Sequence, residues 1–282
     1  MKEKNKDDEV DDEYAHLTYR DYKFEAKMIQ YGVYWDFDIT ERWSDFMKLV
    51  LIRLALIMSQ VHLIKHPDEV LQGSEVAYRI INGQSASNPN GVQMLQTWEW
   101  WTGYGLRTHV YPLWLSLPGL VFKAVGLDTN FIIVNSVHFQ HMLILVLGDY
   151  FGFKFVRQLI GRQEALIALV IALIHEHSNN YILRTSVNGV ESSMLYVVFY
   201  HFINMKPQFF NKHLTCLTMA ITATFVVRSS SIIGYVPLAL IAIYHDQRYL
   251  MPIVVAGLTV AIPMVALSLY IDSCFYGYWI AP

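Results

Sequence analysis

The apolar residues of this chain are grouped in long stretches, and short polar segments separate them. A helix needs about 20 mostly apolar residues to cross a lipid bilayer. Applied along the chain, this requirement predicts about seven membrane-spanning helices. They are expected at residues 46–64, 131–151, 164–177 and 190–205, as two short spans within 215–244, and at 251–270.

Some of the apolar segments contain residues that are unusual in a membrane span. Lys48 and Arg53 lie in the first half of the first span, where long side chains can reach the nearer interface. His138 and His141 lie inside the second span, and we expect them to serve packing or hydrogen bonding. Residues 111–126 are apolar but contain prolines and a lysine, which favours a helix lying in the membrane interface.

Alternate connections between the expected spans are short and contain lysine or arginine. Their basic residues are Lys154, Arg157, Arg162, Lys206, Lys212 and Arg248. Because cytoplasmic loops are enriched in lysine and arginine, these connections and the N-terminus are expected on the cytoplasmic side. The opposite side then receives residues 66–107, 177–191, 228–231 and 272–279, where most of the unusual polar motifs occur. The sequence therefore predicts an all-α polytopic membrane protein whose first non-cytoplasmic loop covers about residues 65–130.

The composition supports this division of the chain. Hydrophobic residues make up 54% of the sequence and charged residues only 16%, against about 25% charged in soluble proteins. Charges are dense in residues 1–45, which predicts a poorly ordered cytosolic tail ahead of a transmembrane domain at 46–282. No basic patch indicates nucleic-acid binding. Cys216 and Cys274 alone are too few for a disulfide framework or a four-ligand zinc site, so we expect no metal.

A pair of carboxylates follows the first expected span, in the run His66-Pro67-Asp68-Glu69. A carboxylate beside an apolar wall has a raised pKa, which suits a general base. The alternative is an ordinary polar helix end, since Pro67 would stop the helix there. The spacing alone leaves both interpretations open.

Arginines and tryptophans occur on the same side of the expected membrane. Arg107, Arg184 and Arg228 could each bind a phosphate, because the guanidinium group matches phosphate oxygens, or could anchor the protein to lipid headgroups. Trp98 and Trp100 flank Glu99 and could stack on a sugar or belong to an interfacial aromatic belt.

The ordered set of motifs resembles a known group of enzymes. It comprises His66-Pro67-Asp68-Glu69 with Gln72 and Glu75, Thr97-Trp98-Glu99-Trp100, Leu106-Arg107-Thr108, Tyr111-Pro112, Arg184-Thr185 with Asn188 and Glu191, Arg228 with Pro237, and Asp272-Ser273 with Tyr276-Gly277 and Trp279. Over about residues 43–282 this set is similar to the lipid-linked mannosyltransferases of the endoplasmic reticulum, which have the GT-C fold. Within them it most resembles the glycosylphosphatidylinositol (GPI) mannosyltransferases of glycosyltransferase family 22.

Two departures accompany the resemblance. Thr108 follows Arg107 where the family usually has serine, and Ser229 follows Arg228 where it usually has proline. Family members also continue with further spans beyond the stretch that contains Trp279, so we expect the chain to be a C-terminally truncated fragment.

The resemblance implies a reaction and a set of site residues. Mannose would pass from dolichyl-phosphate mannose to a mannose of a GPI precursor, with inversion, at the lumenal face of the endoplasmic reticulum membrane. It implies Asp68 as the base with Glu69 as the second choice, and Arg107 and Arg228 at the donor phosphate. His66, Trp98, Glu99, Trp100, Arg184 and Asp272 are the further expected substrate-binding residues. No cofactor is implied beyond the lipid-linked donor.

The acceptor stays open at this level. The Trp98-Glu99-Trp100 run favours the enzyme that adds the third mannose, in α-1,2 linkage. The His-Pro-Asp-Glu form also occurs in the enzyme that adds the fourth mannose and in those that build the lipid-linked N-glycan precursor. Without the resemblance, intramembrane histidines and broken helices would equally suit a transporter, or a non-catalytic scaffold subunit.

Overall fold

A computed structural model describes residues 37–60, 70–83, 98–100, 106–175 and 185–277. Within these residues every regular element is a helix or a helical turn, which confirms the all-α prediction. Two helices of the described part are long and apolar enough to cross a membrane, Asn130–Leu159 and Gln247–Tyr276. The other helices are shorter, so the number of spans stays a prediction.

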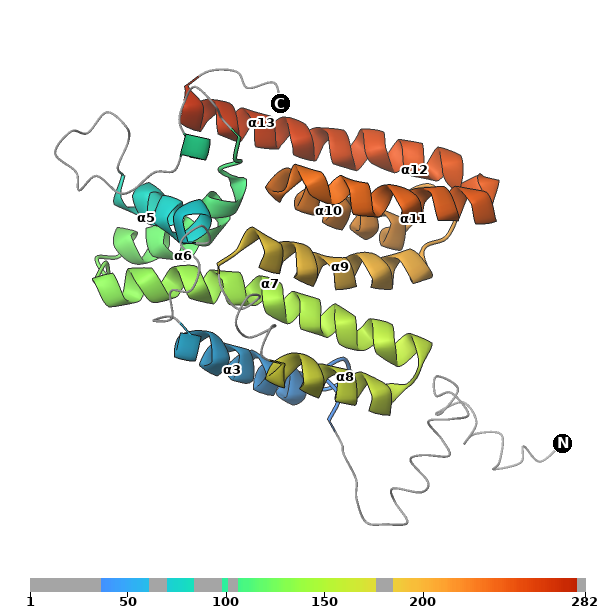
Figure 1. Cartoon of the computed structure of the whole chain (residues 1–282), viewed down its shortest axis with the longest axis horizontal. Coiled ribbons are helices and arrows are strands. Elements are labelled where there is room, and N and C mark those ends of the chain that lie inside the picture. The colour runs from blue at the N-terminus through green and yellow to red at the C-terminus, as the bar shows by residue number, and fades with distance from the viewer. Residues whose placement is uncertain (1–36, 61–69, 84–97, 101–105, 176–184, 278–282) are drawn as a thin grey trace, which may run out of the picture.

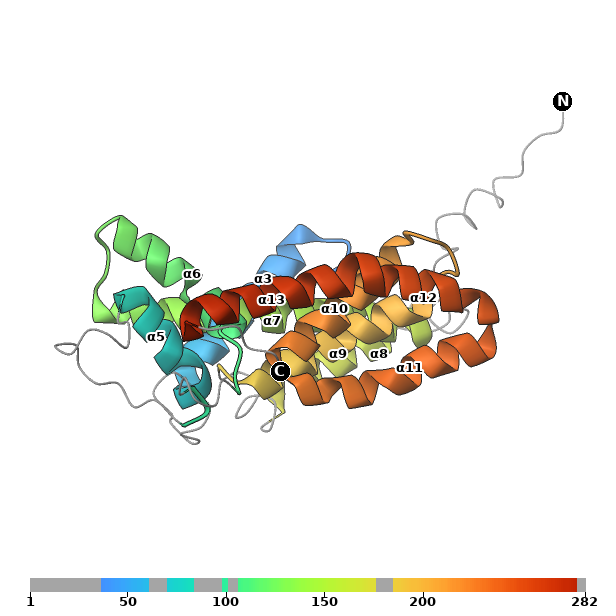
Figure 2. The ribbon, with the colours of Figure 1, turned by 90° about the horizontal axis from the view of Figure 1, so that it is seen from above.

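The long helices run lengthwise in alternating directions and form stacked layers (Figures 1 and 2). In chain order they are α3 (Trp43–Gln60), α7 (Asn130–Leu159), α8 (Arg162–Ile174), α9 (Val187–Asn204), α10 (Lys212–Val227), α11 (Ile232–His245), and a last helix made of α12 (Leu250–Ala256), a π-helical turn η6 (Gly257–Ala261) and α13 (Ile262–Tyr276). α7 contacts α3, α8 and α9, and α10 packs on the other side of α9. The long α7 is therefore the central support of the fold.

Local side-chain chemistry explains where several helices begin. Thr129 caps α7 by accepting a hydrogen bond from the Ile132 amide, and Ser186 caps α9 through the Gly189 amide. Asn211 caps α10 through the amides of His213 and Leu214. Such caps satisfy amides that have no partner within the helix. α10 and α11 are separated at Arg228, whose backbone is extended, and the short turn η4 (Ser229–Ser231) follows. The break expected at residues 228–231 is confirmed.

Small residues set the distance between α7 and α9. A Cβ atom on Gly148 would lie 2.8 Å from Cα of Ser193, which is closer than carbon atoms approach. Glycine and serine at a crossing let two helix backbones come together, as is common in membrane proteins. The first residues of α9 are thereby held close to α7.

Arg53 differs from its expected behaviour at the membrane interface. Its Nε and Nη2 atoms donate to the two carboxylate oxygens of Asp149 on α7, at 2.6 and 2.7 Å, and its side chain is only 4% exposed. A carboxylate within reach makes a buried two-point ion pair possible, so the guanidinium does not extend to the interface. The side chain of Lys48 is 62% exposed and ion-paired with Asp45 at 2.7 Å, and its reach to a membrane interface stays a prediction.

The segment expected as an interfacial helix forms α6 (Val110–Ala124). It runs antiparallel along the first half of α7, since Tyr111 bonds to His141 and Gly119 faces Ser136. A short helix, α5 (Glu75–Asn82), packs against α6 at one end of the long helices (Figures 1 and 2). The position of α6 relative to a membrane stays a prediction.

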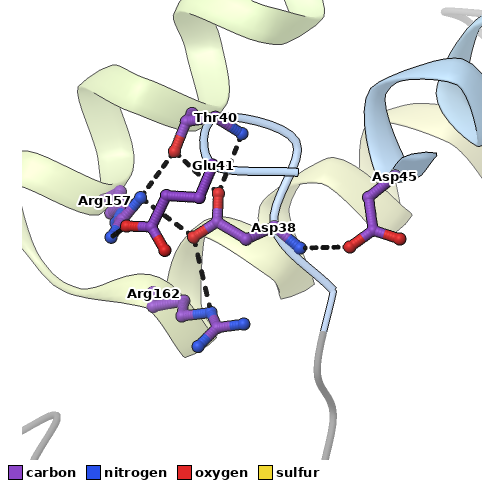
Figure 3. Close-up of polar contacts among 6 residues, drawn as sticks. All are labelled: Asp38, Thr40, Glu41, Asp45, Arg157 and Arg162. Carbon is purple, nitrogen blue, oxygen red and sulfur yellow. Dashed lines mark hydrogen bonds and ion pairs between the residues drawn. The ribbon is translucent and has the colours of Figure 1, made fainter. Parts of the chain in front are cut away.

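Residues 37–45 of the expected disordered tail are packed in place at the other end. Asp38 is 1% exposed and forms an ion pair with Arg157 at the end of α7, 2.9 Å between Oδ2 and Nη1 (Figure 3). Arg162 at the start of α8 approaches the same oxygen at 3.6 Å, and Thr40 donates to the other oxygen. Arg157 also contacts Glu41. The ordered body therefore begins at least at residue 37, ahead of the expected boundary at 46.

Candidate functional site

Most of the described motif residues meet at one end of the long helices, which we call the motif end. It is formed by a π-helical turn η1 (Val70–Ser74), α5, a 3-10 turn η2 (Trp98–Trp100), the start of α6 and the end of α13. In Figure 1 it is the end at which α5, α6 and the end of α13 lie. The connections α7–α8, α9–α10 and α11–α12 lie at the other end, which we call the basic end (Figure 1).

Glu99 lies at the centre of the motif end. Its carboxylate accepts a hydrogen bond from Gln72 at 3.1 Å and an ion-paired one from Nη2 of Arg107 at 3.0 Å. The side chain of Arg107 is 28% exposed, and in the described part of the chain its ion-pair partner is Glu99. The remaining guanidinium donors are thus available to a ligand, and a phosphate would match them.

Asp272 holds the backbone that presents Arg107. Its Oδ1 atom accepts from the His109 amide at 2.6 Å and from the Thr108 hydroxyl at 3.2 Å. Tyr276, one turn later in α13, donates its hydroxyl to the Arg107 carbonyl at 2.8 Å. The sequence suggested Asp272 as a substrate-binding residue. In the structure its contacts are within the protein, and they fix the position of the Arg107 segment.

Three aromatic rings pack around His109, next to this cluster. The ring of His109 stacks in parallel on Phe275 at 4.5 Å, and Trp100 and Tyr276 contact it edge-on at 4.9 and 4.6 Å. Trp100 is only 2% exposed, so its ring packs in the protein interior, unlike the sugar platform or interfacial belt considered from sequence. His109 is a member that the sequence analysis missed, and its position directly after Arg107-Thr108 was the available signal.

A second contact joins η1 to the start of α9. The hydroxyls of Ser74 and Thr185 are hydrogen-bonded at 2.9 Å in a buried position. At Gly73 an added Cβ atom would lie 2.6 Å from the Thr185 carbonyl oxygen, so only glycine fits without a shift. The Arg-Thr motif and the segment that follows Asp68-Glu69 are thereby brought together, although they are far apart in sequence.

Glu75 is the first residue of α5 and directly follows Ser74, and the pKa of its carboxyl group is shifted. Burial raises the pKa of its carboxyl group, and the nearby charge of Arg79 only partly opposes the shift. Glu75 thus holds its proton more tightly than an exposed glutamate.

Arg228 lies at the turn between α10 and α11 and has other partners than Arg107. Its Nη1 atom donates to Asn188 Oδ1 and to Glu191 Oε2, both at 2.6 Å. These partners belong to the first turns of α9, directly after Thr185. The two arginines expected at one donor phosphate therefore occupy separate polar settings, each with its own glutamate.

An apolar cavity of about 500 Å³ lies between α6, α7, α9, α10 and α13. It is lined by Val110, Tyr111, Trp114, Leu143, Ile144, Leu147, Val190, Met194, Ala223, Val226, Val227, Met264, Leu267, Ser268 and Ile271. Val110 directly follows His109, and Ile271 directly precedes Asp272. Two of the cavity's lining residues are therefore chain neighbours of the polar cluster around Arg107.

Several expected site residues lie outside the described residues. These are His66, Asp68, Glu69 and Arg184, together with the side chain of Trp98. Asp68 and Glu69 directly precede η1 in the chain, and Gln72 of η1 contacts Glu99. His141, expected to serve hydrogen bonding, is fully buried and bonded to the Tyr111 hydroxyl, which confirms that expectation. The described residues contain no group of three or more metal-ligand side chains.

Comparison with known proteins gives one family over most of the chain. Residues 46–282 match the model of the Alg9-like mannosyltransferase family. No solved structure matches the chain.

Curated relatives resemble the chain at low identity. GPI alpha-1,2-mannosyltransferase 3 of Danio rerio is 26% identical over 235 residues, which are 82% of this chain and 41% of the relative. GPI mannosyltransferase 3 of Trypanosoma brucei brucei is 22% identical over 267 residues, 83% of this chain and 46% of the relative. Mannosyltransferase APTG1 of Arabidopsis thaliana is 19% identical over 217 residues, 76% of this chain and 38% of the relative. The chain thus spans less than half the length of these relatives.

Proposed function

Because the chain belongs to the Alg9-like mannosyltransferase family, we propose that it transfers mannose from dolichyl-phosphate mannose to a GPI precursor in the endoplasmic reticulum membrane. Relatives named GPI alpha-1,2-mannosyltransferase 3 and the Trp98-Glu99-Trp100 run favour the third mannose, in α-1,2 linkage. The lipid-linked donor supplies the sugar and no cofactor takes part. The acceptor is a mannose of the glycolipid.

The observation that carries the proposal is the apolar cavity whose lining includes Val110, three residues after Arg107. A polyprenyl chain needs an apolar surface, and the phosphate at its end needs a cation. The lining residues Val110 and Ile271 are the chain neighbours of His109 and Asp272, and among the described residues Arg107 is ion-paired with Glu99 through one nitrogen. A lipid phosphate fits this combination of neighbours better than a soluble sugar nucleotide does.

In the proposed reaction Asp68 is the base, with Glu69 as the second choice. The carboxylate takes the proton of an acceptor hydroxyl while the hydroxyl oxygen forms a bond to the anomeric carbon of the donor mannose. The bond from that carbon to the phosphate oxygen breaks on the opposite face, so the configuration inverts. The phosphate leaves as an anion and needs charge stabilisation, which we assign to Arg107. Glu99 and Asp272 orient Arg107 through the contacts described above.

We infer that residues 46–282 form a GT-C-like polytopic bundle with the motif end in the lumen. The long helices alternate in direction, and the connections with Arg157, Arg162, Lys206, Lys212 and Arg248 lie together at the basic end. Basic connections are typical of the cytoplasmic side. The loop at about 65–130 would then face the lumen, and residues 1–45 the cytosol.

Complementation of cells that lack individual GPI or N-glycan mannosyltransferases tests the proposal. We expect the protein to restore the third mannose of GPI precursors, read by mass spectrometry of the extracted glycolipids. Asp68→Asn should lower transfer by about 100- to 10,000-fold, the usual contribution of a positioned base. Asp128→Asn changes an exposed carboxylate between α6 and α7 and is the matched control. Rescue of a different step would reassign the acceptor, and equal rescue by Asp68→Asn would remove Asp68 as the base.

A further inference from the structure

A second cavity, polar in character, lies beside Arg228. It has a volume of about 330 Å³ and is enclosed by the first turns of α9, the turn η4 and the start of α11. Its lining residues are Asn188, Glu191, Ser192, Leu195, Arg228, Ser231, Gly234 and Tyr235. Ligand cavities in proteins start at about 300 Å³, so this one has room for a single small ring.

The cavity contains both donors and acceptors of hydrogen bonds. Arg228 uses only its Nη1 atom on Asn188 and Glu191, and Glu191 uses only Oε2 in that contact. Guanidinium donors and a carboxylate oxygen that have no partner among residues 37–60, 70–83, 98–100, 106–175 and 185–277 thus line the same space. The side chains of Arg228 and Glu191 are 41% and 31% exposed, so both can be reached from outside.

Ser231 indicates that the cavity receives a ligand. The residue is 5% exposed, lines the cavity, and its hydroxyl has no hydrogen-bond partner among the described residues. Buried hydroxyls in native proteins are almost always satisfied by protein, water or ligand. A ligand group that both donates and accepts hydrogen bonds would satisfy the Ser231 hydroxyl.

We propose that this cavity binds the hydroxyl groups of a neutral hexose, and, resting on the proposed function, that the hexose is a mannose of the acceptor glycolipid. A sugar hydroxyl donates and accepts, so it can bond at once to Glu191 and to Arg228 or Ser231. A phosphate only accepts hydrogen bonds. Arg228 is the one cation among the described lining residues, and the carboxylate of Glu191 beside it would repel a phosphate. Arg107 lies three residues before Val110 of the apolar cavity and is assigned to the donor, whereas Arg228 suits the acceptor.

The place of the cavity in the fold agrees with this role. α9 begins directly after Thr185, which is hydrogen-bonded to Ser74 in the segment that follows Asp68-Glu69. The polar cavity and the Arg107 cluster are therefore held at the same end of the molecule through the start of α9.

Equilibrium binding of methyl α-mannoside to the purified protein in detergent, followed by ligand-detected NMR, tests the inference. Ser231→Ala and Glu191→Gln should each weaken mannoside binding on the order of tenfold, the effect of losing one good hydrogen bond. Ser230→Ala, an exposed serine of the same turn, is the matched control and should leave binding unchanged. Inorganic phosphate should not displace the mannoside from the wild type, and Glu191→Gln should bind phosphate more tightly.

Displacement by phosphate in the wild type, absence of mannoside binding, or equal binding by the Ser231 and Ser230 variants would overturn the inference. Thermal unfolding shows whether each variant is folded. If Glu191→Gln does not fold, the Ser231→Ala variant, which removes only one neutral hydroxyl, still tests the inference. This measurement needs no transfer reaction. Failed complementation with Ser231-dependent mannoside binding would therefore reject the proposed function alone, and successful complementation without such binding would reject this inference alone.

Discussion

The two ends of the molecule use the same pair of groups, arginine and carboxylate, in opposite ways. At the basic end Arg157 contacts Asp38, Thr40 and Glu41, and Asp38 is buried (Figure 3). At the motif end Arg107 contacts Glu99 through one nitrogen, and Val110, three residues later, lines an apolar cavity. A saturated arginine fixes the chain, and an arginine with spare donors beside a cavity can bind a ligand.

The two ends also differ in the direction in which the pKa of a carboxyl group is shifted. Burial favours a higher pKa for Asp45, but hydrogen bonds from Lys48 and from the Asp38 amide outweigh it and hold the pKa below its usual value. At the motif end burial prevails and raises the pKa of Glu75. Asp45 at the basic end is stabilised as an anion, whereas Glu75 is kept closer to its neutral form, as is common near reacting groups.

The largest expected effect is on stability, at the basic end. Asp38→Ala leaves Arg157 and Arg162 without their buried carboxylate, and breaking such a pair costs about 3–5 kcal/mol. Thermal unfolding should show the loss, while transfer per folded molecule should hold. A variant with normal stability would mean that the segment before α3 does not hold α7 and α8 together.

The next effect is on transfer, at the motif end. Arg107→Ala removes the cation proposed for the departing phosphate and should lower transfer by about 100- to 1,000-fold. The unfolding temperature should change little, because Arg107 is partly exposed. If stability fell and transfer per folded molecule did not, the assigned roles of the two ends would be reversed.

A smaller effect distinguishes positioning from packing. Tyr276→Phe removes the hydroxyl that bonds to the Arg107 carbonyl and should raise the KM for the lipid donor several-fold, since one hydrogen bond contributes about 1 kcal/mol. Tyr249→Phe removes the same type of bond, from Tyr249 to the Met205 carbonyl, at the basic end. It should leave KM unchanged. Equal KM values in both variants would contradict a role for Tyr276 in placing Arg107.

The smallest effect is the pH dependence of stability, and its sign differs between the ends. Asp45 has a lowered pKa when folded, so its contribution is present above its unfolded pKa of about 3.9 and is lost as pH falls through the lower folded value. Glu75 has a raised pKa, so its contribution is present below about 4.3 and is lost as pH rises through the folded value. Asp45→Asn should lower stability at neutral pH, and Glu75→Gln should raise it slightly.

Unfolding curves recorded from about pH 3 to about pH 8 would show both trends as differences from the wild type. Both variants should converge with the wild type toward the acid end of this range, where the carboxyl groups are protonated in both states, and should diverge from it in opposite directions as pH rises, Asp45→Asn below the wild type and Glu75→Gln above it. Parallel curves for both variants across the range would contradict the assigned shifts.

Residues with a local signal were predicted well from sequence. The apolar stretches located the long helices, and the polar run at Arg228 located the break between α10 and α11. Pairings between distant residues left no such signal. Arg53 and Asp149 are 96 positions apart, and neither position alone indicates a partner. Asp38 was assigned to a disordered tail because the surrounding charges hide one buried contact with α7.

The site shows the same limit. The motif order placed Glu99, Arg107 and Asp272 together, and the structure places them in one cluster. The structure also shows that Trp100 is buried in the interior and that Asp272 contacts the backbone of His109. Both findings depend on how α13 packs on the Arg107 segment. His109 and Ser231 became candidates only through burial and contacts. Burial depends on the whole fold, so a residue type and its neighbours in sequence do not determine it.

The central claim is that the motif end transfers mannose from a lipid phosphate. It is tested most directly by incubating membranes that contain the protein with tritium-labelled dolichyl-phosphate mannose and a GPI precursor bearing two mannoses. We predict a labelled product with three mannoses that α-1,2-mannosidase digests, and its loss with Asp68→Asn or Arg107→Ala. No labelled product from the wild type, or the same yield from both variants, would contradict the account.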